Sequence, residues 1–144
     1  MTTDDIKFDR SLLGVETSIG TIEVTREMIT EYARATGETA PQYTGDDAVA
    51  SPALCTMFTQ GLTLPDIKLE FGSMGLFAGE AVDNLSPVKA GDVLEGRTKL
   101  KDVYAKTGRS GKMVFTVWET SFARPGGEIV ALVRESYVQR GPKE

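Results

Sequence analysis

The sequence contains no histidine and a single cysteine, Cys55. Without histidine the chain cannot form a Ser-His-Asp triad or a Cys-His pair, and it cannot form a histidine-based zinc site. One cysteine can form neither a disulfide within the chain nor a thiolate cage around a metal, which indicates a reducing compartment. The sequence therefore predicts no metal site and no histidine-dependent nucleophile.

Long apolar runs and phosphate-binding loops are also missing. No apolar run approaches the roughly 20 residues that span a bilayer. The first residues, MTTDDIKFDR, are polar and acidic, unlike a signal peptide. Neither GxxxxGK[ST] nor GxGxxG occurs, so nothing supports nucleotide binding through a phosphate loop. We therefore expect a cytoplasmic protein with no membrane association and no cofactor.

The charge balance is acidic, with 16 basic and 21 acidic residues and a formal net charge of −5. A general nucleic-acid binder would show a basic face or stripe instead. The one basic cluster, KTGRSGK, has the composition of a turn between two strands. The sequence thus predicts no nucleic-acid partner.

The 144 residues, of which 40% are apolar and 26% charged, suit a single domain over residues 1–144. The alternating segment Ile19–Val24 predicts a short first strand. The following segment, TREMITEYARAT, has apolar residues at helical spacing. Thr25 is placed to cap this helix at its N-terminus, and Gly37 to end it.

A second helix is predicted over SPALCTMFTQGL, from Ser51 to Leu62. Ser51 would be its cap and Pro52 its first residue, where a missing N–H costs nothing. Apolar residues cover much of its circumference, which favours a buried helix. The next segment, LPDIKLEFGSMG, is ambiguous and predicts a loop.

From Leu76 onward the apolar period changes to that of strands. Four long strands are predicted, separated by the turn signals KAGD, TGRSG and RPGG. Tight turns between them favour an antiparallel meander. With the helices on one face, this is an α+β domain, and the economical arrangement curls the sheet around the buried helix.

The loop TGETAPQY, after the first helix, carries a carboxylate at Glu38 and a polar aromatic residue at Tyr43. We expect Pro41 to prevent the helix from resuming there. Most exposed carboxylates are only solvated, and most half-buried tyrosines pack their ring and hydrogen-bond a loop. From the residues alone, the loop is a working site, an altered site or a plain connection.

The order strand, helix, TG[D/E]xxPxY, buried helix, PVKAGDVL and three strands resembles the MaoC-like dehydratase family, in its FAS1-like branch. The resemblance covers about Phe8 to Arg140, and its most specific marker is NLSPVKAGDVLEG, from Asn84 to Gly96. It implies the hot-dog fold, in which an antiparallel sheet wraps around a central helix. It also implies a hydratase or dehydratase activity on acyl thioesters.

In this family the catalytic motif G-D-x-N-P-x-H supplies an aspartate and a histidine that hold the reacting water. Relative to that motif, the chain keeps Gly37 and Pro41, but has Glu38 for the aspartate, Ala40 for the asparagine and Tyr43 for the histidine. Tyrosine, with an ordinary pKa near 10, is a poor base at neutral pH. The resemblance therefore implies an altered catalytic site at Glu38 and Tyr43.

The family also implies where a thioester would bind. A backbone N–H at the start of the central helix polarises the thioester carbonyl, where developing negative charge is favoured. In this chain that assigns substrate binding to Ser51, Ala53, Leu54 and Met57. The alternative is that these amides are capped by Ser51 or by water.

Three functions follow from the resemblance. The preferred one is a subunit of an enoyl-CoA hydratase or (3R)-3-hydroxyacyl-thioester dehydratase, acting with a histidine-bearing partner on CoA or carrier-protein thioesters. The alternatives are a stand-alone hot-dog thioesterase that uses Glu38, and a non-catalytic acyl-CoA-binding protein. A homodimer or heterodimer is expected because the edge of a sheet invites pairing.

Overall fold

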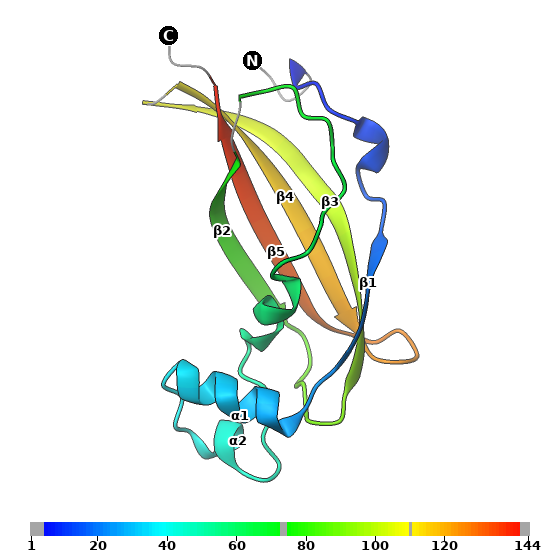
Figure 1. Ribbon diagram of the computed structural model, residues 1–144, viewed down its shortest axis with the longest axis vertical. Coiled ribbons are helices and arrows are strands. Elements are labelled where there is room, and N and C mark those ends of the chain that lie inside the picture. Colours follow the sequence, from blue (N-terminus) through cyan, green and yellow to red (C-terminus); the bar gives the residue numbers. More distant parts are fainter. Residues whose placement is uncertain (1–4, 73–74, 110, 142–144) are drawn as a thin grey trace.

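The computed structural model describes residues 5–72, 75–109 and 111–141, which form one five-stranded antiparallel sheet with helical segments over one face (Figure 1). The strands are β1 (Thr17–Glu23), β2 (Gly75–Asn84), β3 (Val93–Gly108), β4 (Gly111–Ala123) and β5 (Ile129–Arg140). The helical segments are η2 (Arg10–Leu12), α1 (Arg26–Ala35), α2 (Pro41–Thr44) and η3 (Leu54–Thr59). The predicted strands and the α+β class are confirmed.

The strand order in the sheet is β1-β3-β4-β5-β2. Strands β3, β4 and β5 form the predicted meander, but β2 pairs with β5 rather than with β3, so the four-strand meander was wrong. The turn signal KAGD ends a longer connection, residues 85–92, that joins the edge strand β2 to β3, which lies beside β1 at the opposite edge of the sheet. This connection pairs with the chain before η3, through the Ala50 amide to the Val88 carbonyl at 2.7 Å and a bridge between Val49 and Lys89.

Helix α1 begins and ends as the sequence predicts. The Thr25 hydroxyl accepts a hydrogen bond from the Met28 amide at 3.1 Å, as an N-cap does. Gly37 has a φ of 77°. The Gly37 amide donates to the Arg34 carbonyl and the Glu38 amide to the Ala33 carbonyl, the pattern of a Schellman C-cap. The backbone of Glu38 therefore belongs to the helix end.

The second predicted helix is shorter and tighter than expected. It is the 3₁₀ segment η3, and Ala53 occupies its N-cap position without a side-chain hydrogen bond. The prediction that Ser51 caps this helix was therefore wrong. Two threonines explain the difference: Thr56 donates its hydroxyl to the Ala53 carbonyl at 2.7 Å, and Thr59 donates to the Thr56 carbonyl at 3.0 Å. Such bonds to carbonyls three residues back compete with α-helical bonds.

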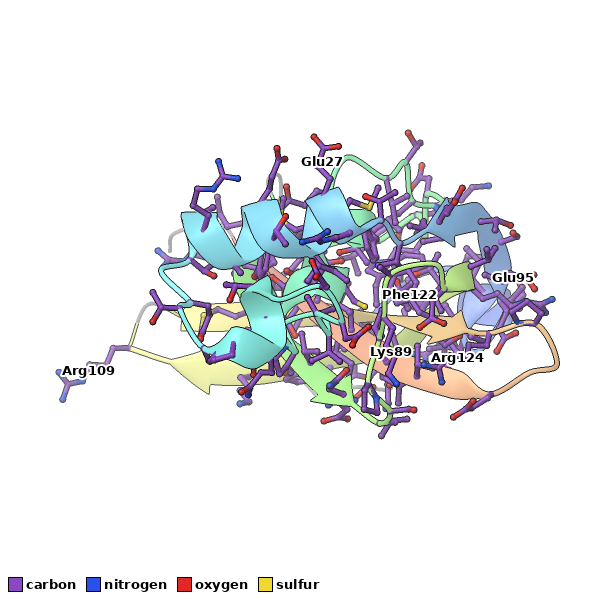
Figure 2. All side chains as sticks on the ribbon, turned by 90° about the horizontal axis from the view of Figure 1, so that it is seen from below. Glu27, Lys89, Glu95, Arg109, Phe122 and Arg124 are labelled. Atoms are coloured by element: carbon purple, nitrogen blue, oxygen red, sulfur yellow. The ribbon has the colours of Figure 1, made fainter. Side chains whose placement is uncertain are left out.

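The core lies between the helical segments and the concave face of the sheet. Figure 2 shows Phe122 of β4 on this inner side, whereas Arg109 extends from the far end of the molecule. Phe122 is fully buried and meets Phe58 of η3 edge to face at 5.7 Å. A second apolar cluster, around Trp118 and Leu100, continues toward the β3–β4 turn. The sheet thus curls around η3, which confirms the hot-dog prediction.

Strand β2 forms one edge of the sheet and is mostly exposed. Two of its apolar side chains are largely in solvent, with Leu76 49% and Phe77 56% exposed. None of the helices in the described part of the chain is long and apolar enough to cross a membrane.

Candidate functional site

The loop between α1 and α2 holds the two residues predicted to be catalytic. Glu38 is exposed and follows the C-cap of α1, and no described residue forms a hydrogen bond or ion pair with its carboxylate. Tyr43 is half-buried in the short helix α2, where its amide donates to the Ala40 carbonyl. The prediction that Pro41 prevents a helix here was wrong. Pro41 is the first residue of α2, because a proline at the first helical position loses no hydrogen bond.

A hollow of about 420 Å³ lies beside this loop, lined by Arg34, Glu38 and neighbouring residues of α1 and α2. Tyr43 is not among the lining residues, so the structure does not bring the two predicted catalytic side chains into one hollow. Glu38 is an exposed carboxylate near an arginine rather than a member of a paired acid and base. Its role, and that of Tyr43, stays a prediction.

The predicted substrate-binding residues lie just before η3 and within it. The Leu54 amide donates to the backbone oxygen of Ser51 at 2.9 Å, so it is engaged within the chain. The Ala53 carbonyl accepts from Thr56, and Leu54 is buried with 3% of its surface exposed. Met57 is 46% exposed on the outer side of the segment. Their binding roles also stay predictions.

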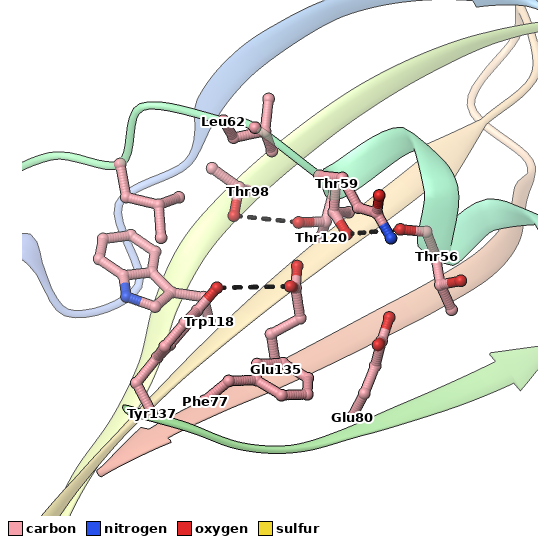
Figure 3. Close-up of a pocket in the computed structure, with 13 residues that line it drawn as sticks. Thr56, Thr59, Leu62, Phe77, Glu80, Thr98, Trp118, Thr120, Glu135 and Tyr137 are labelled. Carbon is pink, nitrogen blue, oxygen red and sulfur yellow. Dashed lines mark hydrogen bonds between the residues drawn. The ribbon is translucent and has the colours of Figure 1, made fainter. Parts of the chain in front are cut away.

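A different cavity, of about 330 Å³, lies between η3 and the concave face of the sheet (Figure 3). None of the six predicted site residues lines it. Strands β2, β3, β4 and β5 all contribute side chains. The polar and aromatic residues among its lining are Thr56, Thr59, Gln60, Phe77, Glu80, Thr98, Trp118, Thr120, Glu135 and Tyr137.

Two carboxylates meet in this cavity on neighbouring strands. Glu80 of β2 and Glu135 of β5 are direct cross-strand partners, and Figure 3 shows both side chains pointing into the cavity. The Tyr137 hydroxyl donates to Oε2 of Glu135 at 3.4 Å. Burial, and then the charge of Glu135, raises the pKa of Glu80. Burial, and then the same charge, also raises the pKa of Tyr137.

Hydroxyl groups line the opposite wall. Thr120 donates to Thr98 across β3 and β4 at 3.1 Å, and both residues are 2% exposed. Together with the two carboxylates, these groups make the cavity a place where a ligand can form several hydrogen bonds. In the described parts of the chain, no group of three or more His, Cys, Asp or Glu could hold a metal ion.

The sequence does carry a signal for this cavity. Every second residue of β5 faces inward, which places Val133, Glu135 and Tyr137 on the same face. A glutamate on this face departs from the apolar pattern expected of inward-facing residues. The same position in the sheet places Glu80 opposite it. The pairing of β2 with β5 could not be read from the turn signals, so the facing carboxylates were missed.

The sheet curled around η3, with a cavity between them, defines a protein of the hot-dog class. Residues 11–133 match the family described as the FAS1-like, dehydratase domain region, and the chain belongs to that family. None of the curated proteins matches the sequence.

Solved structures of hydratases and dehydratases share the fold. The HadBC (3R-hydroxyacyl-ACP dehydratase) complex from Mycobacterium tuberculosis aligns with a TM-score of 0.67 at 19% identity, over 90% of this chain and 98% of that one. The ChsH1-ChsH2 complex from the same organism aligns with a TM-score of 0.66 at 16% identity, over 91% and 85%. R-hydratase PhaJ1 from Pseudomonas aeruginosa gives 0.62 at 15%, over 92% and 84%.

Proposed function

We propose that this protein is a cytoplasmic subunit of an enoyl-thioester hydratase or (3R)-3-hydroxyacyl-thioester dehydratase, and that a partner subunit supplies the catalytic aspartate and histidine. The observation that carries the proposal is that this chain belongs to a dehydratase family but has no histidine in its sequence. At the motif positions, Glu38 and Tyr43 do not line a common hollow. An acid and a base acting on one substrate must reach it together.

Two solved relatives of the same fold support the idea of an assembly of two kinds of subunit. HadBC and ChsH1-ChsH2 are both described as complexes of two named components. In this chain β2 leaves one edge of the sheet unpaired within the described structure, with Leu76 and Phe77 exposed on it. Pairing of that edge with a second hot-dog subunit would cover apolar surface and satisfy strand hydrogen bonds.

The proposed substrate is the thioester of CoA or of an acyl carrier protein. The solved neighbours include a 3R-hydroxyacyl-ACP dehydratase and an R-hydratase, which supports a reaction at the double bond or hydroxyl next to a thioester. The acidic net charge of −5 does not favour the phosphates of CoA over a carrier protein. Either carrier is compatible with the fold.

Co-expression tests the proposal. We expect the chain to co-purify with a hot-dog protein that carries D-x-N-P-x-H, and the pair to hydrate enoyl-CoA substrates. Replacing the histidine of that partner with alanine should abolish hydration by the pair. A pair that keeps its activity after this change would contradict the proposal.

The variants Glu38→Gln and Tyr43→Phe test whether this chain contributes acid–base chemistry of its own. In the proposed assembly, each should change kcat of the pair by less than about threefold, because a true general acid or base contributes about 100-fold or more. A loss of 100-fold with Glu38→Gln would instead favour a catalytic role for this glutamate, as in the thioesterase alternative. Steady-state kinetics with enoyl-CoA and acyl-CoA substrates separate the two.

A further inference from the structure

We propose that the cavity between η3 and the sheet binds a small organic cation with N–H donors, such as a primary alkylammonium group, held between Glu80 and Glu135. Binding there would require neither a partner subunit nor the hydration reaction. The cavity has a volume of about 330 Å³ and lies apart from the α1–α2 loop, whose residues do not line it.

The charges of the cavity point to a cation. Like charges placed directly opposite on antiparallel strands are destabilising, yet Glu80 and Glu135 face each other across β2 and β5. None of the lining residues, all in the described part of the chain, is Lys or Arg. The arginine next to Glu135, Arg134, is paired instead with Asp83 at 2.8 Å and with Glu119 at 3.4 Å. A ligand cation would therefore supply the missing countercharge.

The hydroxyl groups of the cavity are arranged as acceptors. Tyr137 donates to Glu135, Thr120 donates to Thr98, and Thr59 and Thr56 donate to backbone carbonyls, so these hydrogens are engaged within the protein. Their oxygens keep lone pairs for a ligand. Among the side-chain donors of the lining, Thr98, Trp118 and one N–H of Gln60, whose amide donates once to Sδ of Met57, have no acceptor in the described structure. The ligand must therefore bring most of the donors.

The aromatic side chains favour an organic cation over a hydrated metal ion. Phe77, Trp118 and Tyr137 line the cavity beside the carboxylates, and Phe77 meets Tyr137 edge to face at 5.8 Å. A cation close to such rings is attracted by their π-electrons. Ca²⁺ and Mg²⁺ are coordinated by about six or more oxygen atoms, and two carboxylates alone provide fewer. Figure 3 shows Phe77, Tyr137 and both glutamates on the side of the cavity that β2 and β5 form.

Chemical-shift titration of the isotope-labelled full chain tests the site. At pH 7.5 and constant ionic strength, n-butylammonium chloride should shift the signals of β2, β5 and Trp118. The neutral isostere n-butanol should bind at least about 10-fold more weakly, since hydrogen bonds to charged groups are the stronger ones. Equal binding of the two compounds, or shifts that map elsewhere, would overturn the proposal.

Two further probes define the ligand class. Tetramethylammonium chloride, a cation without N–H donors, should bind more weakly than n-butylammonium, and equal binding would overturn the requirement for donors. Magnesium chloride should not compete for the same signals. Competition by magnesium at concentrations below those of n-butylammonium would show an inorganic cation site instead.

Matched variants connect the binding to the two carboxylates. Glu80→Gln and Glu135→Gln should each weaken n-butylammonium binding about 10-fold, whereas Glu23→Gln, at the end of β1 outside the cavity, should leave it unchanged. Unchanged binding in both cavity variants would refute the site. Circular dichroism of each variant checks that it is folded.

The melting temperature of Glu80→Gln gives a second test, in which the variant is expected to be more stable rather than less. Because burial and the charge of Glu135 raise the pKa of Glu80, its ionised form is disfavoured in the folded state. Glu80→Gln should therefore raise Tm at pH 7.5, and the gain should vanish below the ordinary carboxyl pKa of about 4.3. Glu135 and Tyr137 are the other titratable groups of the lining, since η3, β3 and β4 contribute none. A lower Tm for Glu80→Gln would contradict the assignment.

Discussion

Gly96 shows how one residue fixes the approach of β1 to the core. A β-carbon on Gly96 would lie 2.5 Å from Cγ1 of Ile19 and 3.2 Å from Cε1 of Phe122. Phe122 is fully buried, and Ile19 packs against the same core cluster, so neither can move away without disturbing that packing. The backbone of Gly96 is not in the left-handed region, so space rather than conformation requires glycine here.

The variant Gly96→Ala is therefore expected to lower the free energy of unfolding by about 1 to 3 kcal/mol, the usual cost of overpacking a core. Urea unfolding measures it. Gly79→Ala is the matched control, because Gly79 also lies in a strand and no atom lies within 4 Å of its added β-carbon. Equal stability of the two variants would contradict the packing argument.

At the same scale, the sequence could identify the unusual residues of the α1–α2 loop but not their surroundings. The absence of histidine and the glutamate and tyrosine at the motif positions are visible in the text of the sequence. That Glu38 stands exposed after a Schellman cap depends on how Gly37 and Pro41 divide the chain between two helices. The facing pair Glu80 and Glu135 depends on strand pairing, which a single sequence does not state.

At the scale of elements, two clusters of charge hold the sheet and its long connection in place. The Arg124 guanidinium, which follows β4, binds Asp92 at 3.1 Å and the carbonyl of Pro87. Figure 2 shows Arg124 close to Lys89 of the same connection. Asp92 in turn accepts from the Lys89 amide at 2.8 Å. The family marker PVKAGDVL thus contains residues that anchor the connection from β2 to β3.

Glu119 of β4 is the centre of the second cluster. It is 8% exposed and binds Lys101 at 2.7 Å, Arg134 at 3.4 Å and Lys99 at 3.8 Å. Burial acts to raise the pKa of its carboxyl group, but the hydrogen bonds from Lys101 and Arg134 and the charges of Lys101 and Lys99 outweigh burial, and the pKa is lowered. The ionised carboxylate therefore stabilises three neighbouring strands.

The variant Glu119→Gln should lower the free energy of unfolding by about 1 to 3 kcal/mol at pH 7, because it removes a buried carboxylate that accepts hydrogen bonds from partly exposed cations. A carboxyl group with a lowered pKa stabilises the fold above its unfolded pKa. This contribution is lost as pH falls through the folded value, so the deficit should shrink below about pH 4.

Urea unfolding at pH 7 and pH 3 checks the prediction. Glu95→Gln is the control, since its ion pair with Arg97 joins two half-exposed side chains and should contribute less than about 1 kcal/mol. A deficit in Glu119→Gln that does not change with pH would show that the carboxylate charge is not its cause.

The elements themselves were predictable to different degrees. Long strands and helix α1 follow from local periodicity, with Thr25 and Gly37 marking the ends of α1. The tight 3₁₀ form of η3 arises from the hydroxyls of Thr56 and Thr59 bonding back to the chain, which apolar periodicity does not reveal. The position of β2 beside β5 is a long-range pairing, and turn composition at KAGD favoured the wrong neighbour.

At the scale of the whole molecule, the exposed edge strand and the missing histidine support the same account. Strand β2 carries exposed apolar side chains on an edge with no neighbour in the described structure. In the proposed assembly, another subunit supplies the catalytic pair that this chain lacks. The fold and the family are established by the sheet and by the match over residues 11–133.

The measurement that tests the central claim most directly is the initial rate of enoyl-CoA hydration by the purified chain alone, compared with the chain mixed with its histidine-bearing partner. A panel of trans-2-enoyl-CoA thioesters of different chain lengths covers the unknown acyl group. The account predicts no hydration above the uncatalysed rate by the chain alone and rapid hydration by the mixture. Rapid hydration by the chain alone would contradict it.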